Sequence, residues 1–227
     1  MQNKFKKLII VGAGEFAEIA YEYFRYDSEY EVVAFAVESK FISREILFDI
    51  PIIAFETMQE KYSPKEYEVF VAITYVKLNR VRTRLYQEVK NKGYSCASYI
   101  SSRAFVWHNA IIGENTFIFE NNTIQYHTKI GNNVVLWSGN HIGHRSVIED
   151  NCWLTSHVVV SGFCKVGKNS FLGVNATLGD NVALPEDTVF GAGALTVKSL
   201  QDAGYVYVGS PAHKTGKTSY QQFGIEQ

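Results

Sequence analysis

The chain has 227 residues, enough for one large domain or two small ones. Its formal net charge of −1 gives no general attraction to nucleic acid or to an anionic membrane, so any phosphate binding must be local. Cys96, Cys152 and Cys164 have no spacing typical of a metal site, and we expect reduced thiols in a cytoplasmic protein. The apolar run at residues 8–11 is too short for a signal peptide or a membrane span.

Residues 1–98 alternate strand-like and helix-like segments. Strands are predicted over residues 8–11, 32–37 and 69–73, and helices over residues 15–26 and 79–91. This alternation predicts a small parallel α/β domain over residues 1–98, which resembles a Rossmann fold.

The first predicted strand is followed by Gly12, Gly14 and Ala17, which open the first helix. This is the context of a turn that cradles phosphate, and Gly12, Gly14 and Glu15 are candidate substrate-binding residues. A nucleotide-sugar diphosphate fits better than NAD, because Ala17 replaces the third glycine and the domain holds only one mononucleotide half. Glu38, at the end of the second strand, is a candidate partner for a ribose hydroxyl. The alternatives are a purely structural turn and an exposed carboxylate.

From Ile100 onward, every sixth residue is a bulky hydrophobe. The series is Ile100, Val106, Ile112, Ile118, Ile124, Ile130, Leu136, Ile142, Ile148, Leu154, Val160, Val166, Leu172, Leu178, Leu184 and Phe190. A period of six fits neither a helix nor an alternating strand, and it is typical of a hexapeptide solenoid with three short strands in each coil. The sequence therefore predicts a parallel β-helix over residues 99–227, with a C-terminal tail, in which residues 18 apart stack. All these hydrophobes are expected to point inward.

Asparagine or glycine recurs three places after many of these hydrophobes. The positions are Asn109, Asn115, Asn121, Asn133, Gly139, Asn151, Asn169, Asn175, Asn181 and Gly193. Both residue types tolerate the left-handed backbone that a tight corner requires, so we expect these positions to form the corners of the coils.

The chain resembles the sialic acid O-acetyltransferase family, which includes the N-acetyltransferases of bacterial nucleotide amino sugars. The resemblance rests on the glycine turn after residues 8–11, the junction at residues 100–104, the coil around His144, and the stretches 191–194 and 208–212. It implies a left-handed β-helix, a homotrimer, acetyl-CoA between adjacent solenoids, and a sugar nucleotide held partly by the N-terminal domain. It leaves the substrate open.

A general base is needed to take a proton from the attacking amine or hydroxyl, and histidine is the natural choice near neutral pH. His144 lies two places after Ile142, where the family motif carries its catalytic histidine. The usual neighbouring acid is missing, because Gly143 precedes His144 and Arg145 follows it. The alternative is a solvent-facing histidine without a role.

His141 is the second candidate base, and it otherwise lies at a subunit interface. The 18-residue stacking places Tyr126 one coil from His144, so a contact between them and with substrate is expected. The family's second histidine falls at Trp153, which we expect to pack. A zinc site of the kind found in hexapeptide carbonic anhydrases would need three convergent histidines, and no metal is expected.

Acyl-CoA brings phosphates and a pantetheine arm to the solenoid. The candidate CoA-binding residues are His157, Gly173, Gly191, Ala192, Lys198, Gly209 and Lys214. The alternative for the lysines is solvated surface.

The sequence thus predicts an acetyl-CoA-dependent N-acetyltransferase for a UDP- or dTDP-linked amino-deoxysugar in bacterial surface glycan biosynthesis, such as lipopolysaccharide. O-acetylation of sialic acid or another sugar and transfer of a longer acyl group stay open. The rival from another class is a non-enzymatic solenoid that serves as a scaffold or sensor.

Overall fold

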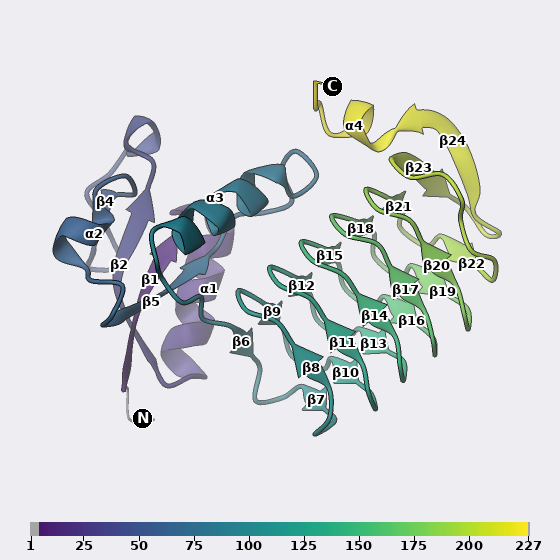
Figure 1. Cartoon of the computed structure of the whole chain (residues 1–227), viewed down its shortest axis with the longest axis horizontal. Coiled ribbons are helices and arrows are strands. Elements are labelled where there is room, and N and C mark those ends of the chain that lie inside the picture. The colour runs from purple at the N-terminus through teal and green to yellow at the C-terminus, as the bar shows by residue number, and fades with distance from the viewer. Residues whose placement is uncertain (1–4, 227) are drawn as a thin grey trace. The chain divides into compact units, whose positions relative to one another are not determined.

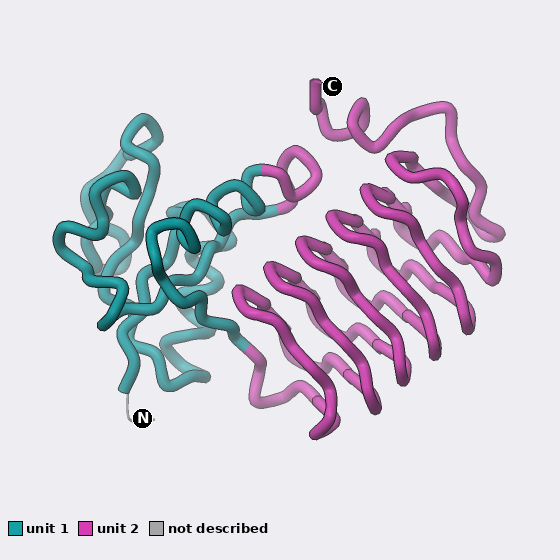
Figure 2. Tube along the Cα trace, in the orientation of Figure 1, with its two compact units in different colours: residues 1–74, 81–99 teal, residues 75–80, 100–227 magenta. Residues whose placement is uncertain are grey.

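The computed structural model describes residues 5–226, and it contains two compact units, drawn in different colours in Figure 2. The first unit holds the chain up to residue 74 together with residues 81–99. The second holds residues 75–80 together with the chain from residue 100. Segment 75–80 is therefore part of the second unit although it lies within the sequence of the first.

The first unit is a five-stranded sheet in the order β3-β4-β2-β1-β5. Its strands are β1 (Lys6–Val11), β2 (Tyr30–Val37), β3 (Ile46–Leu47), β4 (Ile50–Ala54) and β5 (Tyr67–Val71). All neighbouring pairs are parallel except β3 with β4, which is antiparallel. The helices are α1 (Glu15–Tyr26), η1 (Ser39–Phe41), α2 (Met58–Lys61) and α3 (Arg80–Asn91). Residues 8–11 are at most 2% exposed, which explains a continuous apolar run in place of alternation.

The predicted parallel α/β fold is confirmed, and α1 begins and ends at the predicted residues. The elements η1, β3, β4 and α2 were not predicted. They lie between residues 39 and 61, where the chain has no helical or alternating period.

The second unit is a parallel β-helix whose two-residue strands recur every six residues along three walls (Figure 1). The first wall contains β7 (Phe105–Val106), β10 (Thr123–Ile124), β13 (His141–Ile142), β16 (Val159–Val160), β19 (Thr177–Leu178) and β22 (Leu195–Thr196). The second wall contains β8 (Ile111–Ile112), β11 (Lys129–Ile130), β14 (Val147–Ile148), β17 (Lys165–Val166) and β20 (Ala183–Leu184). The third wall contains β6 (Tyr99–Ile100), β9 (Phe117–Ile118), β12 (Val135–Leu136), β15 (Trp153–Leu154), β18 (Phe171–Leu172) and β21 (Val189–Phe190), followed by β23 (Tyr205–Val208) and β24 (His213–Thr218).

The repeated hydrophobes line the interior of this left-handed β-helix. From Ile118 to Phe190, each of them is at most 2% exposed. The expectation of full burial is wrong at the first coil, where Ile100 is 40% exposed and Val106 and Ile112 are half-buried. These three residues belong to the edge strands β6, β7 and β8, which have a neighbouring strand on one side only.

Two columns of corner residues share one backbone geometry and differ in side chains. The asparagine column follows the second wall and consists of Asn115, Asn133, Asn151, Asn169 and Asp187, all with positive φ. The mixed column follows the first wall and consists of Asn109, His127, Arg145, Phe163 and Asn181. All but Asn109 have positive φ. Asn109 lies in the turn between β7 and β8 without the left-handed backbone that was expected there, and its Oδ1 accepts the His127 N–H (2.9 Å).

The asparagine column is hydrogen-bonded from coil to coil. Nδ2 of Asn115, Asn133 and Asn151 donates to Oδ1 of the next asparagine at 2.8, 2.8 and 3.1 Å. At the next step Asp187 accepts from Arg80 Nη2 (2.6 Å) and from the Tyr220 hydroxyl (2.7 Å). A carboxylate at this step can serve two donors, one from segment 75–80 and one from the tail.

The tail ends in α4 (Ser219–Gln222), which begins with a capping box between Thr218 and Gln221. The Ser219 hydroxyl donates to the Asp187 carbonyl (2.6 Å). From segment 75–80, Leu78 packs with Val189 and Val206. The tail and this segment therefore pack on the same outer face of the third wall.

Candidate functional site

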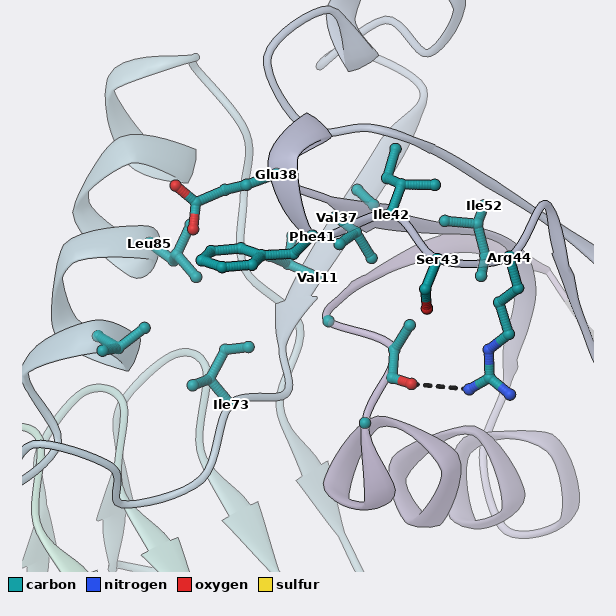
Figure 3. Close-up of a pocket in the computed structure, with 15 residues that line it drawn as sticks. Val11, Val37, Glu38, Phe41, Ile42, Ser43, Arg44, Ile52, Ile73 and Leu85 are labelled. Carbon is teal, nitrogen blue, oxygen red and sulfur yellow. Dashed lines mark hydrogen bonds between the residues drawn. The ribbon is translucent and has the colours of Figure 1, made fainter.

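The glycine turn of the first unit opens into a cavity of about 450 Å³ (Figure 3). Gly12 has φ +119, and a Cβ there would lie 2.8 Å from the Ala72 carbonyl oxygen, so only glycine fits. A Cβ on Gly14 would meet nothing within 4 Å, which leaves this backbone open to a ligand. Glu15 begins α1 and is exposed, whereas Ala17, at the third glycine position, is fully buried.

Glu38 lines the same cavity but its carboxylate is already paired. It accepts from Arg84 Nη2 at 2.9 Å and lies 3.6 Å from Lys40 Nζ. Hydrogen bonds to Glu38 and Glu88 raise the pKa of Arg84 above its ordinary value. The structure thus brings Glu38 together with Gly12 and Gly14 at one cavity, with its carboxylate paired to Arg84 and Lys40.

Two further pocket residues were missed by the sequence reasoning. Arg44 Nη2 donates to the Ala13 carbonyl (2.8 Å) and to the Glu18 carboxylate (2.9 Å), as the dashed line in Figure 3 shows for Ala13. Phe41 lines the cavity and is 64% exposed. Both follow the carboxyl end of β2, where ligand-binding loops of parallel sheets gather, and that position was the available signal.

On the solenoid, His144 lies at an exposed corner two residues after the end of β13. Its backbone N–H donates to Gln125 Oε1 (3.0 Å), and its carbonyl accepts from the Phe163 N–H (3.0 Å). The imidazole lies against Gly162, since a Cβ there would approach His144 Cε1 to 2.6 Å and Nε2 to 2.8 Å. His144 is therefore placed by the coil on either side of it.

The neighbours of His144 differ from the expectation at one point. The Tyr126 ring lies 4.1 Å from the His127 ring and 5.4 Å from the Arg145 guanidinium, measured to ring centroids. Within residues 5–226 no ring pairing of Tyr126 with His144 is present, although a contact between the two residues was expected. The reason is that Tyr126 turns toward the corner residues beside it. His141 faces outward on the first wall, half-buried, with Thr123 and Val159 as its neighbours in the ladder.

The glycines proposed for CoA contact occupy places where a side chain would collide. A Cβ on Gly173 would lie 2.4 Å from the Ala192 nitrogen, and one on Gly191 would lie 3.0 Å from Val208 Cγ1. Gly209 has φ +93 and accepts at its carbonyl from the Leu195 N–H (3.0 Å). Close stacking of coils explains these glycines, and their role toward CoA stays a prediction.

The remaining candidates lie at corners and in the tail. His157 is exposed with φ +59, and its ring covers Gly139, where a Cβ would lie 2.5 Å from His157 Nδ1. Lys198 is exposed, whereas Lys214 on β24 pairs with Asp202 (2.7 Å), which raises the pKa of this lysine. Lys214 is thus not a free cation in the structure.

Trp153 is 1% exposed and packs among aromatic side chains, as expected. Its ring centroid lies 5.3 Å from that of Tyr75 and 6.2 Å from that of Trp137. In the part of the chain that the structure describes, no three His, Cys, Asp or Glu side chains gather to hold a metal ion. No helix within residues 5–226 is both long and apolar enough to cross a bilayer.

Two family models match the chain. Residues 7–89 match the PglD N-terminal domain, and residues 109–144 match the bacterial transferase hexapeptide (six repeats). The first match covers the unit with the glycine turn, and the second ends at His144.

Solved structures with the same architecture span nearly the whole chain. A variant of perosamine N-acetyltransferase from Caulobacter crescentus, in complex with CoA and GDP-perosamine, has 23% identity and a TM-score of 0.82 over 96% of this chain and 100% of that chain. The acetyltransferase domain of PglB from Neisseria gonorrhoeae, with acetyl coenzyme A, has 21% identity and a TM-score of 0.82 over 94% and 100%. WeeI from Acinetobacter baumannii AYE has 19% identity and a TM-score of 0.72 over 93% and 100%.

At these identities the likeness establishes the fold, and the two family models identify its parts. Residues 7–89 thus resemble the PglD N-terminal domain and residues 109–144 resemble bacterial transferase hexapeptide repeats, while nearly the whole chain shares the fold of the solved acetyltransferases.

Proposed function

We propose that this protein is an acetyl-CoA-dependent N-acetyltransferase that acts on a nucleotide-linked amino-deoxysugar, in the biosynthesis of a bacterial surface glycan. The observation that carries the proposal is one chain holding both a nucleotide-sized cavity at a glycine turn and a hexapeptide solenoid with an exposed histidine at a coil corner. The structurally similar perosamine N-acetyltransferase binds CoA and GDP-perosamine, and the PglB domain binds acetyl coenzyme A.

In the proposed reaction, the sugar amine nitrogen bonds to the thioester carbonyl carbon of acetyl-CoA. The C–S bond then breaks and CoA leaves as the thiolate, while His144 takes the proton that the nitrogen loses. An amine needs less activation than a hydroxyl, and this favours N- over O-acetylation at a histidine flanked by Gly143 and Arg145. His141, on the adjacent strand, is the alternative base.

The first unit is proposed to hold the nucleotide. Backbone N–H groups at Gly14 and Glu15 would meet the diphosphate at the start of α1. Gly12 would shape the turn beside it, since its own N–H donates to the Ala36 carbonyl (2.9 Å). Arg44 supports this placement because it offsets the negative charge of Glu18 in the first turn of that helix. Glu38 would accept from a ribose hydroxyl, and Phe41 offers an exposed ring to the base.

Acetyl-CoA is proposed to lie along the solenoid, between neighbouring copies in a cytoplasmic homotrimer. The candidate contacts are His157, Gly173, Gly191, Ala192, Lys198, Gly209 and Lys214, with Tyr126 toward the sugar. Support for self-association comes from apolar side chains that the first wall leaves exposed: Phe105 (53%), Trp107 (42%) and Val159 (37%). Sedimentation of the full chain should give the trimer mass, and a monomer would contradict this part of the proposal.

The test is release of free thiol from acetyl-CoA with a panel of UDP-, dTDP- and GDP-linked 3-amino and 4-amino sugars. At least one should be turned over, and His144→Ala should lower kcat by about 10²–10⁴-fold. Longer acyl-CoAs and sugar hydroxyl acceptors run in parallel to test those alternatives. If no acceptor gives thiol release, the enzyme proposal is wrong and a non-enzymatic solenoid is favoured. Full activity in both His144→Ala and His141→Ala would contradict the assignment of the base.

A further inference from the structure

Phe163 occupies a corner where its residue type is unsuited to the backbone. Its φ is +56, in the left-handed region that Asn and Gly adopt readily and that bulky residues avoid. Its side chain gains little from burial, because it is 53% exposed. Asn181, one coil further along the mixed column, has φ +62 with the residue type that the corner favours. Neither the backbone nor the hydrophobic interior therefore accounts for a phenylalanine at this place.

The Phe163 ring does make one close contact with a candidate catalytic group. Its centroid lies 5.1 Å from that of the His144 imidazole, with the planes at 83°, so the two rings meet edge to face. This geometry is favourable for aromatic rings. The adjacent Gly162 lies beneath the same imidazole, which would have to shift if Gly162 carried a side chain. Two consecutive residues of one coil thus bound the His144 ring on two sides.

The charged side chains nearest to His144 in the coil are engaged elsewhere. Arg145, directly after His144, places its guanidinium over Tyr126. Asp180 accepts the Gly162 N–H at 2.8 Å, so its carboxylate supports the glycine beneath the ring. Within residues 5–226 no hydrogen bond to either His144 ring nitrogen is present. In the Ser-His-Asp arrangement a carboxylate holds the imidazole; here the contacts to the ring come from an aromatic edge and a bare glycine.

We infer that Phe163 is a positioning residue that holds the His144 imidazole in its catalytic orientation by edge-to-face packing, in place of an orienting carboxylate. The inference rests on the proposed role of His144 as the base. It predicts that Phe163 acts on the rate of proton removal and not on the binding of acetyl-CoA. It also explains why an unfavourable residue type stands at this corner.

The test replaces Phe163 by the residue that suits its backbone. Phe163→Asn should leave the thermal unfolding midpoint unchanged or raise it, while kcat falls roughly ten- to a hundredfold and the KM for acetyl-CoA stays within about twofold. Phe163→Tyr keeps the aromatic edge and should restore most of kcat. The matched control is His127→Asn in the same column (φ +54), which relieves the same backbone and should leave kcat unchanged.

A second readout does not depend on turnover. Carbon-13 relaxation at His144 Cε1 should show a lower order parameter in Phe163→Asn than in the parent protein, with no change in His127→Asn. Unchanged order of the imidazole, or unchanged kcat, would each overturn the inference. If none of the acceptors in the panel leads to thiol release, the proposed function is refuted instead. The relaxation measurement would still decide whether Phe163 orders the His144 ring.

Discussion

The asparagine column and the mixed column, Asn109 excepted, have the same left-handed backbone at their corners. The asparagine column has residue types that suit this backbone, and the mixed column includes residue types that do not. In both columns corner N–H groups donate to a backbone carbonyl one coil back, for example Asn151 to Asn132 (2.9 Å) and Phe163 to His144 (3.0 Å), whereas the His127 N–H donates to Asn109 Oδ1. Only the asparagine column adds a side-chain ladder, and its members are largely buried. A left-handed residue other than Gly, Asn or Asp costs roughly 1–2 kcal/mol, so His127, Arg145 and Phe163 lower the stability of the mixed column. The asparagine ladder therefore stabilises the solenoid, whereas the residues at the His144 corner are present for a reason other than stability.

The largest effect is expected when the ladder is broken in its middle. Asn133→Ala removes a donor and an acceptor from a fully buried position and leaves alanine at φ +56. We expect a loss of about 2–4 kcal/mol in the free energy of unfolding, measured by denaturant titration. The control is His127→Ala, which leaves alanine at the same backbone without breaking the ladder and should cost less than about 1 kcal/mol. Equal losses in the two variants would show that the ladder contributes nothing.

A smaller loss is expected at the end of the ladder. The two carboxylate oxygens of Asp187 accept from Arg80 and from Tyr220. In Asp187→Asn only one oxygen is left, so one of these donors loses its acceptor. We expect a cost of about 1–2 kcal/mol, because the ion pair is partly exposed. A rise in the free energy of unfolding of Asp187→Asn would show that position 187 favours asparagine, as the other positions of the column do. The role assigned to the carboxylate would then be wrong.

The same variant predicts a change in tyrosine titration. The hydrogen bond to Asp187, followed by burial, raises the pKa of Tyr220 above its ordinary value of 10.0. The stabilisation from this hydrogen bond is therefore complete below pH 10 and is lost as the pH rises through the raised pKa. In Asp187→Asn the pKa of Tyr220 should fall toward 10, as followed by ultraviolet absorbance.

The smallest effect is a gain. His127→Asn places the preferred residue type at φ +54 and should raise the free energy of unfolding by about 1 kcal/mol, read from the thermal midpoint. Destabilisation would show that the contact between His127 and Tyr126 outweighs the backbone cost.

Much of the fold follows from periodicity alone. The six-residue period of hydrophobic residues predicted the walls, the interior and the corners of the solenoid, because stacking places equivalent positions in equivalent environments. The glycine turn and Glu38 were predicted to share a site, and they line one cavity. Arg44 and Phe41 escaped notice because they lie in a segment without period.

Other features depend on tertiary contacts that no local pattern records. Segment 75–80 reads as an ordinary connection before a helix, yet it belongs to the second unit. Its membership rests on long-range contacts, such as Asn79 Nδ2 to the Asn169 carbonyl (3.3 Å). Likewise, the pairing of Lys214 with Asp202 follows from the antiparallel course of β23 and β24, which the solenoid period does not encode.

The discontinuous second unit has a practical consequence for dissecting the protein. A fragment that begins at residue 100 would lack Tyr75, whose ring packs on Trp153 and Phe171, and Arg80, the ionic partner of Asp187. Such a truncation would strip an aromatic surface of its cover and invite aggregation. Expression of the solenoid on its own therefore calls for a graft of segment 75–80, or for polar replacements on that surface.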